Sequence, residues 1–553
     1  MYKLHEGEIL IKEKYGSTSR QRFYVKPPDQ GNIVVLDEGN HHDMTDWFTR
    51  IFLPQGYPDS VSKDYMAYQI WDTAQAFCST ITGTLATQEV LRGVGVGDTT
   101  ATPLAATVTW VIKDGCGHLG KIVFAFTHGT YLDAYSKKWR LYADTLNDAA
   151  MCIEMSLPMF RSYTRSALCI STIMKAVVGV AGGATRVAMT QHHAVRGNLA
   201  DVAAKDSAQE TAVNLLASFT ALFIISVFGN SLPIFAAAVV LHVACNYMAV
   251  RAVCLRTLNE PRLLHVVDGY LRREVVAAPC DANRSEPVIF YQLGPNLLDL
   301  KLSGFQIKLG CSLKKLIGSN PDASYWATVE EIYGDRSYIL HPDVHDRRMY
   351  VLVKECAGTD DVLCAYFHAV ILAIIICAIN DEPLSVYCGV GASSRPFAQV
   401  CRALQAAEWS RAPAAGRAAG AGAGRLAHAP AGELVRYVAR VAAAEWRRVR
   451  PALARTGWDL SKHLLVVDEW RVCSKTIVTD AISMEKLPDV NASPAISFGD
   501  VADNIGSDDD VLNKTYTIEP DGSLKEPSRT KAQDAPETTD TLLKSVSDTI
   551  KQD

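Results

Sequence analysis

Two long segments without a single charged side chain constrain this chain more than any other feature of its sequence. They span Ala212–Gly229 and Ile234–Val250, and a turn-forming Asn-Ser-Leu-Pro tetrapeptide separates them. A helix that crosses a bilayer needs about 20 apolar residues, with a usual range of about 17 to 25, so each segment lies at the short end of that range. The pattern predicts an apolar helical hairpin over residues 212–250.

Basic residues flank this hairpin on both sides, and they set its expected orientation. Lys and Arg stay preferentially on the cytosolic or matrix side of a membrane, so both ends of the hairpin are expected there. The alternative is a buried hairpin in the core of a large soluble all-α protein, and the low charge from residue 166 to residue 250 favours the membrane. The flanking residues are Arg196 and Lys205 before the hairpin and Arg251, Arg256 and Arg262 after it.

The composition narrows the expected compartment and partners. The formal net charge of −5 gives no attraction to nucleic acid, so a nucleic-acid partner is not expected. The 14 cysteines are scattered without a CxxC pair, which is typical of reduced, buried thiols. The polar N-terminus shows no secretory signal. We therefore expect an intracellular membrane, with the organelle left open.

A polar stripe lies on a helix that is expected to follow the Pro/Gly-rich segment 53–58. Its members are Gln69, Asp72, Gln75, Ser79 and Thr82, which bring amides and hydroxyls but only one carboxylate. A surface helix usually carries Lys and Glu on its wet face, so this stripe is expected to be enclosed. Gln69, Asp72 and Gln75 are candidate ligand-binding residues.

Glycines and one lysine supply the other candidates. Gly93, Gly95 and Gly97, closed by Asp98, are expected to form a turn that either binds a phosphate or simply joins two helices, since the P-loop ending is missing. A second helix is expected from Thr102-Pro103 to Ile112, stopping at Lys113-Asp114-Gly115. Lys113 and Asp114 are candidates because a lysine in an apolar setting forms Schiff bases. The remaining candidates are Asp201 and Lys205, a pair spaced i, i+4.

Several long sequence motifs between residues 54 and 262 resemble the signature of the root ultraviolet-B sensitive (RUS) family. They are PQGYPDSV, DYMAYQIWD, LRGVGVGD and WVIKDGCGHLG between residues 54 and 120, NLADVAAKDSAQET at 198–211 and TLNEPR at 257–262. The resemblance implies a link to vitamin B6 homeostasis and auxin distribution. It makes pyridoxal phosphate a candidate cofactor, and a homo-oligomer or a hetero-oligomer with another family member a candidate assembly.

The expected fold is mainly α, with four parts along the chain. Residues 1–45 form an N-terminal extension with strands at Gln21–Val25 and Ile33–Leu36, and residues 46–260 form the helical domain with the hairpin. Residues 261–475 are expected to form a smaller α+β domain with a low-complexity insertion at 406–432, and residues 476–553 a disordered acidic tail. Within the α+β domain we expect strands at Val288–Tyr291, Ser337–Leu340 and Met349–Val353, a core helix at Asp361–Ile379 and an amphipathic helix at Glu433–Ala454.

Two classes of function are compatible with these residues. The favoured hypothesis is a membrane-associated helical protein that handles or senses a small metabolite without catalysing a reaction. The alternative is a soluble cofactor-binding protein or enzyme that uses the glycine-rich turns and Lys113. No hydrolase, protease or NTPase motif is present, so no catalytic residue is assigned. No metal is expected either, because His192-His193 and the pair His341 and His345 are interpreted as exposed loop histidines.

Overall fold

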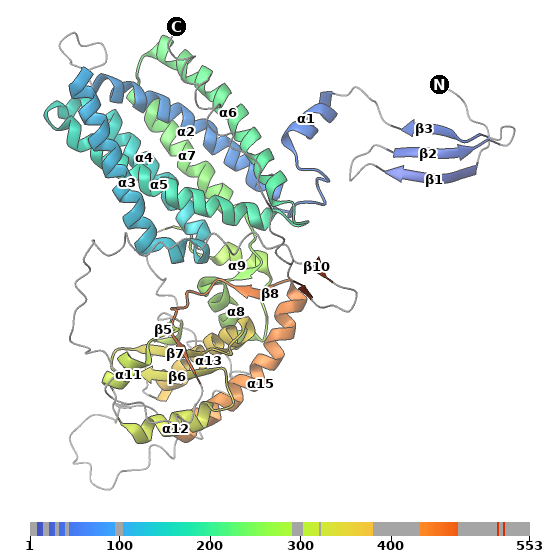
Figure 1. The fold of residues 1–553 in the computed structure, drawn as a ribbon, viewed down its shortest axis with the longest axis vertical. Coiled ribbons are helices and arrows are strands. Elements are labelled where there is room, and N and C mark those ends of the chain that lie inside the picture. The colour runs from blue at the N-terminus through green and yellow to red at the C-terminus, as the bar shows by residue number, and fades with distance from the viewer. Residues whose placement is uncertain are drawn as a thin grey trace, which may run out of the picture. The chain divides into compact units, whose positions relative to one another are not determined.

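The computed structural model confirms a mainly helical protein (Figure 1). It describes residues 8–14, 21–27, 32–38, 44–93, 103–289, 302–319, 322–379 and 432–473, and two short strands at 517–518 and 524–525. The chain forms two compact units, Met1–Lys475 and Thr476–Asp553. In the second unit the two strands, β10 (Thr517–Ile518) and β11 (Leu524–Lys525), pair antiparallel. The expected insertion up to residue 431 and the rest of the expected tail lie outside the described residues.

The N-terminal extension contains a three-stranded antiparallel sheet. Its strands are β1 (Glu8–Lys14), β2 (Gln21–Lys26) and β3 (Val34–Glu38), in the order β1-β2-β3. The two strands predicted from the sequence are β2 and β3, and β1 was not predicted. The short helix α1 (Met44–Phe52) follows.

Six long helices form the main body of the part that follows. They are α2 (Tyr65–Gly93), α3 (Pro103–Ala134), α4 (Ser136–Met155), α5 (Thr164–His193), α6 (Leu199–Phe228) and α7 (Leu232–Ala252), with the 3-10 turn η1 (Leu157–Tyr163) between α4 and α5. Successive helices run in opposite directions (Figure 1). Helix α2 lies against α4, α6 and α7, while α5 lies against α3 and α4. We call the end where α2, α4 and α6 begin the proximal end, and the opposite end the distal end.

The predicted hairpin is present as α6 and α7, joined by a short turn. Gly229 has a φ of +67°, a left-handed conformation that glycine adopts without strain, and it ends α6. The helix begins at Leu199, well before the uncharged segment, so its first turns carry Asp201, Lys205 and Asp206. Ala217 and Ala221 are fully buried against α2 and α7, where their small side chains let the helices approach closely.

The prediction that a helix stops at Lys113-Asp114-Gly115 is wrong, because α3 continues without a break to Ala134. The glycines that suggested a stop serve helix packing instead. A Cβ on Gly117 would lie 3.0 Å from a methyl carbon of Thr172 on α5, and one on Gly120 would lie 3.3 Å from Ile173. Only glycine lets α3 approach α5 this closely. Thr102-Pro103 was correctly predicted as the start of this helix.

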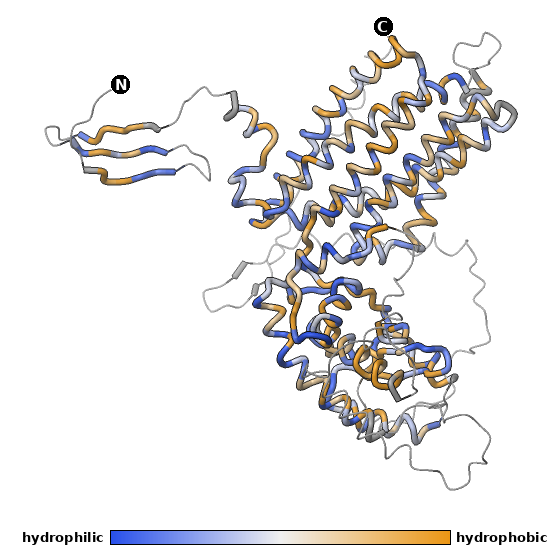
Figure 2. Tube along the Cα trace, turned by 180° about the vertical axis from the view of Figure 1, so that it is seen from behind, coloured by the Kyte–Doolittle hydropathy of each residue, from blue (hydrophilic) through white to orange (hydrophobic). Residues whose placement is uncertain are grey.

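The helices of the bundle are hydrophobic along much of their length (Figure 2), and many of their apolar side chains are exposed. Large apolar side chains are exposed at helical spacing along the outer faces of three helices. On α3 they are Val108, Val111, Ile112, Leu119, Ile122, Val123 and Phe126, on α6 Leu215, Leu216, Phe219, Leu222, Phe223, Val227 and Phe228, and on α7 Val240, Leu241 and Met248. In the described part of the chain, α5, α6, α7 and α13 (Thr359–Ile379) are long and apolar enough to cross a membrane.

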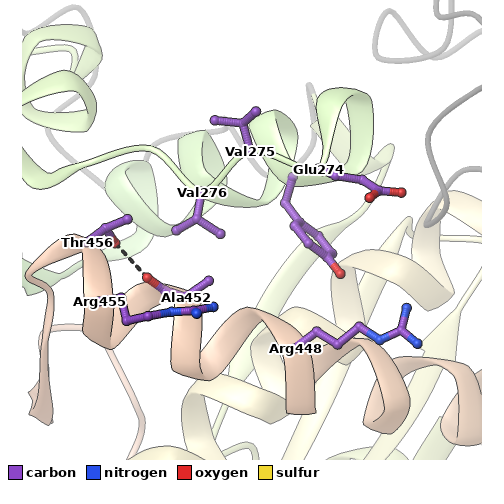
Figure 3. Close-up of a pocket in the computed structure, with 8 residues that line it drawn as sticks. Glu274, Val275, Val276, Arg448, Ala452, Arg455 and Thr456 are labelled. Carbon is purple, nitrogen blue, oxygen red and sulfur yellow. Dashed lines mark hydrogen bonds between the residues drawn. The ribbon is translucent and has the colours of Figure 1, made fainter.

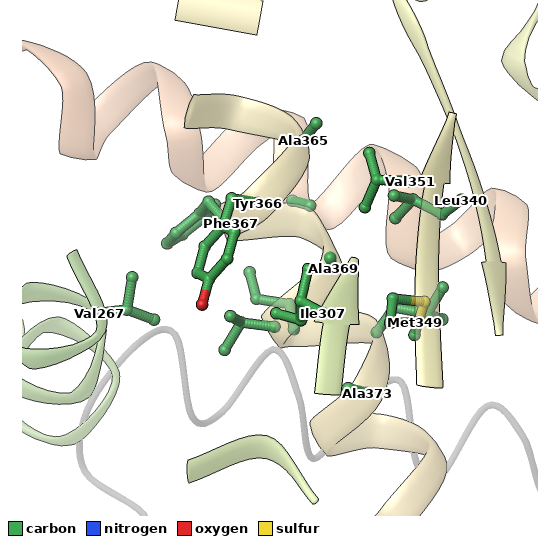
Figure 4. Packing of buried hydrophobic residues seen from close by; sticks show 14 of the residues in the cluster. Val267, Ile307, Leu340, Met349, Val351, Ala365, Tyr366, Phe367, Ala369 and Ala373 are labelled. Carbon is green, nitrogen blue, oxygen red and sulfur yellow. The ribbon is translucent and has the colours of Figure 1, made fainter. Parts of the chain in front are cut away.

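The fourth of these helices, α13, is the core of a small α+β assembly, as its sequence predicted. It is enclosed by β5 (Gln306–Leu309), β6 (Tyr338–Asp343), β7 (Arg348–Lys354) and α15 (Gly432–Thr456). Figure 4 shows Ala369 and Ala373 of α13 on the side of Ile307 and Met349 in the sheet, and Phe367 on the opposite side, toward Val267 of α8. The Phe367 ring lies 5.5 Å from that of Trp446 in α15. Since its side chains are already buried, α13 has no face left for lipid.

The sheet and its surrounding helices match the predicted α+β character of this region. Strand β7 pairs parallel with β5 and β9 (Arg471–Val472) and antiparallel with β6, while β4 (Thr257–Leu258) pairs parallel with β8 (Asp459–His463). The strand expected at Val288–Tyr291 does not form over 288–289, which are irregular, and its other residues lie outside the described part. The remaining helices are α8 (Glu260–Arg273), α9 (Pro279–Ser285), α11 (Leu313–Ser319) and α12 (Ala323–Tyr333). The boundary at residue 260 stays a prediction.

Candidate functional site

The polar stripe of α2 faces the interior of the bundle, as its composition predicted. Gln69 and Gln75 are buried, and Asp72 is mostly shielded from solvent. Asp72 accepts a hydrogen bond from Arg140 of α4 at 3.0 Å and from Gln75 at 3.3 Å. The lone carboxylate of the stripe is therefore held by a cation from a neighbouring helix, which is the arrangement that buried charges require.

Helix α7 extends this network across the bundle. Arg140 also reaches Asp144 at 3.4 Å, and Asn246 donates to the same carboxylate. The ring of His242 lies between Asp148 of α4, at 2.7 Å, and the side-chain oxygen of Gln75, at 2.8 Å. Both ring nitrogens thus face side-chain oxygens, so His242 links α4 to α2 through the interior of the bundle.

A second branch joins α2 to α5 and α6. Asp206 accepts two hydrogen bonds from the guanidinium of Arg186, at 2.7 and 2.8 Å, and a third from Gln69 at 3.1 Å. Arg186 also pairs with Glu210 at 2.6 Å, and Gln209 donates to the Phe52 carbonyl. Carboxylates and cations therefore alternate through the middle of a bundle whose outer surface is apolar.

A cavity of about 380 Å³ opens between α3 and α5, toward the distal half of the bundle. One face of α3 lines it with Trp110, Lys113, Asp114, Gly117, His118 and Lys121, spaced three and four apart. The ammonium of Lys113 lies 3.8 Å from the centre of the Trp110 ring, a cation–π contact. Across the cavity, Lys175 of α5 pairs with Glu154 at 2.6 Å. The cavity offers cations and an aromatic ring to a small anionic ligand.

The predicted ligand-binding residues therefore fall in three separate places. Gln69, Asp72 and Gln75 belong to the central network, and Lys113 and Asp114 belong to the cavity. At the proximal end, Asp201 accepts from the Gln55 backbone N–H at 2.7 Å, and Lys205 donates to the Arg50 carbonyl, so both hold the segment before α2. Gly93 is the last residue of α2. Gly95, Gly97 and Asp98 lie outside the described residues.

Arg140, Arg186, Asp206, His242, Lys175 and Glu154 were not predicted as site residues. A usable signal was present for Arg186, His242, Lys175 and Glu154, since each is an ionisable residue inside a segment that is otherwise apolar or small. Their partners come from other helices, with more than 60 residues of sequence between Asp72 and Arg140, so periodicity within one helix could not pair them.

A more open cavity of about 510 Å³ lies between the end of α8 and the C-terminal half of α15 (Figure 3). Arg448, Arg455 and Glu274 stand at its rim, and Thr456 donates to the Ala452 carbonyl at 3.0 Å. Tyr270 lines it and donates to Glu445, and burial together with this contact raises the pKa of the Tyr270 hydroxyl. Glu445 also pairs with Arg448 at 3.4 Å. Since Tyr270, Glu445 and Arg448 thus already have partners, we favour the cavity in the helical bundle.

Comparison with known proteins identifies similarity over most of the described chain. Residues 38–274 match the family profile described as "Vitamin B6 photo-protection and homoeostasis domain", and residues 275–389 match "Root UVB sensitive protein, C-terminal". No solved structure matches the chain.

Three curated relatives show how far the similarity extends. "Protein root UVB sensitive 3" of Arabidopsis thaliana is 31% identical over 392 residues, which cover 66% of this chain and 84% of the relative. "RUS family member 1" of Dictyostelium discoideum is 46% identical over 300 residues, which cover 52% of this chain and 57% of the relative, so the match spans little more than half of that protein. "Protein root UVB sensitive 2, chloroplastic" of Arabidopsis is 30% identical over 275 residues, covering 49% of this chain and 63% of the relative.

Proposed function

Because the chain belongs to the root UVB sensitive family, we propose that residues 65–252 insert into a membrane and bind a small polar metabolite within the bundle. The family profile is described by vitamin B6 photo-protection and homoeostasis, so vitamers of B6 are the first metabolites to test. The protein acts in this proposal as a carrier or sensor and not as an enzyme.

The observation that carries the proposal is the inverted polarity of the bundle. In a soluble protein the charged groups face water and the large apolar side chains lie inside. Here Arg140 and Asp206 are enclosed, while Phe219 of α6 is 64% exposed and Phe126 of α3 is 90% exposed. Single exposed apolar residues are ordinary, but continuous apolar faces on neighbouring helices mark a surface that meets another apolar phase. Lipid chains supply such a phase.

The distribution of basic residues supports one orientation. The chain enters and leaves the six-helix bundle at the proximal end. There Cys254, which follows α7, donates its backbone N–H to Asp64, which precedes α2, at 2.6 Å. Lys and Arg gather at that end, so it faces the cytosol or the matrix. The proximal residues are Arg50, Lys63, Lys137, Lys138, Arg196, Lys205, Arg251 and Arg256, and the distal ones are Arg92, Arg161 and Arg165.

Selective labelling of two engineered cysteines tests this insertion. Met159, in the turn between α4 and α5 at the distal end, and Val195, between α5 and α6 at the proximal end, are both well exposed. On a background without reactive native thiols, Val195→Cys is expected to react at once with an impermeant maleimide added from the cytosolic side of sealed vesicles. Met159→Cys is expected to react only after the bilayer is permeabilised.

The result that contradicts insertion is equal labelling of both cysteines in intact vesicles, with release of the protein by alkaline carbonate. That result would leave the soluble cofactor-binding alternative. The structure weakens this alternative in one respect, because the glycines from Gly115 to Gly120 lie within α3 and form no ligand-binding turn.

Ligand binding is tested at Lys113, since its amine lies beside an aromatic ring in a cavity large enough for a pyridine ring with a phosphate. Pyridoxal phosphate carries an aldehyde, which condenses with an amine to an imine and water. Borohydride reduction is expected to fix the probe on Lys113 at micromolar concentration, with protection by excess unlabelled pyridoxine phosphate. Lys113→Gln should lose this labelling, while Lys462→Gln, on the exposed part of β8, should keep it. Equal labelling of Lys113 and surface lysines would show that the cavity has no affinity for this ligand class.

Assembly is the remaining part of the proposal. Self-association, or association with another family member, is proposed on the ground of family membership alone. Light scattering on the detergent-solubilised protein measures it directly.

A further inference from the structure

Three metal-ligating side chains meet at the proximal end of the bundle, outside both the central network and the cavity. Asp64 precedes α2, and His192 and His193 are the last two residues of α5. Nε2 of His192 lies 2.9 Å from one carboxylate oxygen of Asp64, and Nδ1 of His193 lies 3.9 Å from the other. One ligand atom from each of the three residues lies within 4.8 Å of the others.

From these residues we propose that Asp64, His192 and His193 bind one divalent cation of the zinc class. Neutral imidazole nitrogens and a carboxylate oxygen are ligands that zinc and cobalt share. With metal–ligand bonds of about 2.0–2.1 Å, two ligand atoms on one tetrahedral ion lie roughly 3.3 Å apart. The distances of 2.9 and 3.9 Å run to different oxygens of Asp64, and one ligand atom from each residue lies within 4.8 Å of the others, so the side chains rotate to bring all three to one ion.

The backbone around the three residues holds them in register. Ser62 donates its N–H to the His193 carbonyl at 3.1 Å, and Val195 donates to the Ser60 carbonyl at 3.3 Å. The Cys254 backbone N–H donates to Asp64 at 2.6 Å and orients its carboxylate from behind, as contacts behind metal ligands commonly do. A bound ion would therefore join the start of α2 and the end of α5 beside the segment that follows α7.

His192 and His193 are not the exposed loop residues that the sequence predicted, because they end α5 and are shielded from solvent. His341 is not one either, since it lies buried in β6, whereas His345 is exposed as predicted. His193 is 2% exposed, and its Nε2 has no hydrogen-bond partner among the described residues. Its Nδ1 lies 2.6 Å from the Ser62 hydroxyl, which is placed to complete the coordination or to hold a coordinated water. The ring of His193 also packs against the rings of Tyr65 and Tyr68, with centroids 5.5 and 5.0 Å away, and this packing holds it beside Asp64. The ion is independent of the proposed metabolite.

Metal content of the full-length protein tests the site. The protein is purified in detergent with a tag that binds no metal, saturated with zinc and dialysed. Elemental analysis is expected to give about one zinc per chain, and EDTA is expected to lower the melting temperature. Cobalt(II) in place of zinc should give the visible absorption of a tetrahedral site.

Conservative variants separate binding from folding. His192→Gln retains a hydrogen-bond donor toward Asp64 but is a poor zinc ligand, so it should lose the metal while remaining folded. The matched control is His345→Gln, since His345 is almost fully exposed beside Asp346, and it should keep the metal. Less than a tenth of a zinc per wild-type chain, with no cobalt spectrum and no effect of EDTA, would overturn the proposal without reference to any variant.

Discussion

Replacing Arg140 by leucine is expected to destabilise the helical bundle by about 3–5 kcal/mol, which exceeds the effect of most single substitutions. Arg140 lies between Asp72 of α2 and Asp144 of its own helix, at 3.0 and 3.4 Å. Its removal leaves two enclosed carboxylates close together without a cation. The leucine adds little in return, since the arginine stem already packs in the interior.

Thermal unfolding of the purified protein in detergent measures this loss. Arg196→Leu is the control, because Arg196 is largely exposed and its contact with Asp59 is long, at 3.9 Å, so its loss should cost less than about 1 kcal/mol. Combining Arg140→Leu with Asp72→Asn should recover part of the stability, since one of the two stranded charges is gone. If Arg140→Leu alone melts like the wild type, the interior is hydrated and the charges there need no partners.

The sequence predicted those features that repeat within one helix. The uncharged segments 212–229 and 234–250 predicted the hairpin, and the amides of α2 predicted an enclosed stripe. The first inference used the length and lack of charge of each segment, and the second used the spacing of polar side chains, which a helix converts directly into one face. The core helix α13 was predicted in the same way, from its apolar length and its neighbouring strands.

The sequence failed where one residue type has two structural uses. Glycine commonly ends helices, but it also lets two helices pack closely. The sequence analysis assumed a helix end near Gly117 and Gly120, whereas both glycines allow close packing of α3 against α5. The candidate site had a different difficulty. Asp72, Lys113 and Asp201 were all predicted as ligand-binding residues, but the packing of the helices puts them in separate places, because only long-range contacts decide which faces meet.

A single arginine on the outer face of α6 is expected to prevent stable insertion of the bundle. Phe219 and Leu222 are 64% and 58% exposed, and they lie near the middle of the uncharged part of the helix. If that face meets lipid, Phe219→Arg or Leu222→Arg costs about 2.5–3.5 kcal/mol on insertion scales. The protein should then move from the carbonate-resistant membrane fraction to the soluble or degraded fraction.

The exposure of these side chains makes the experiment decisive, because the soluble alternative predicts the opposite result. In water an exposed phenylalanine contributes little to stability, so its replacement by arginine changes stability by less than about 0.5 kcal/mol and improves solubility. Val195→Arg, in the loop at the proximal end, is the matched control, since an arginine there adds to a basic surface. Asn230 is a poor control, because its side-chain amide donates to Glu89 and to the Leu85 carbonyl and so holds the turn against α2. If Phe219→Arg is as abundant as Val195→Arg and fully soluble, the outer face of α6 meets water, and the charged interior then needs a different explanation.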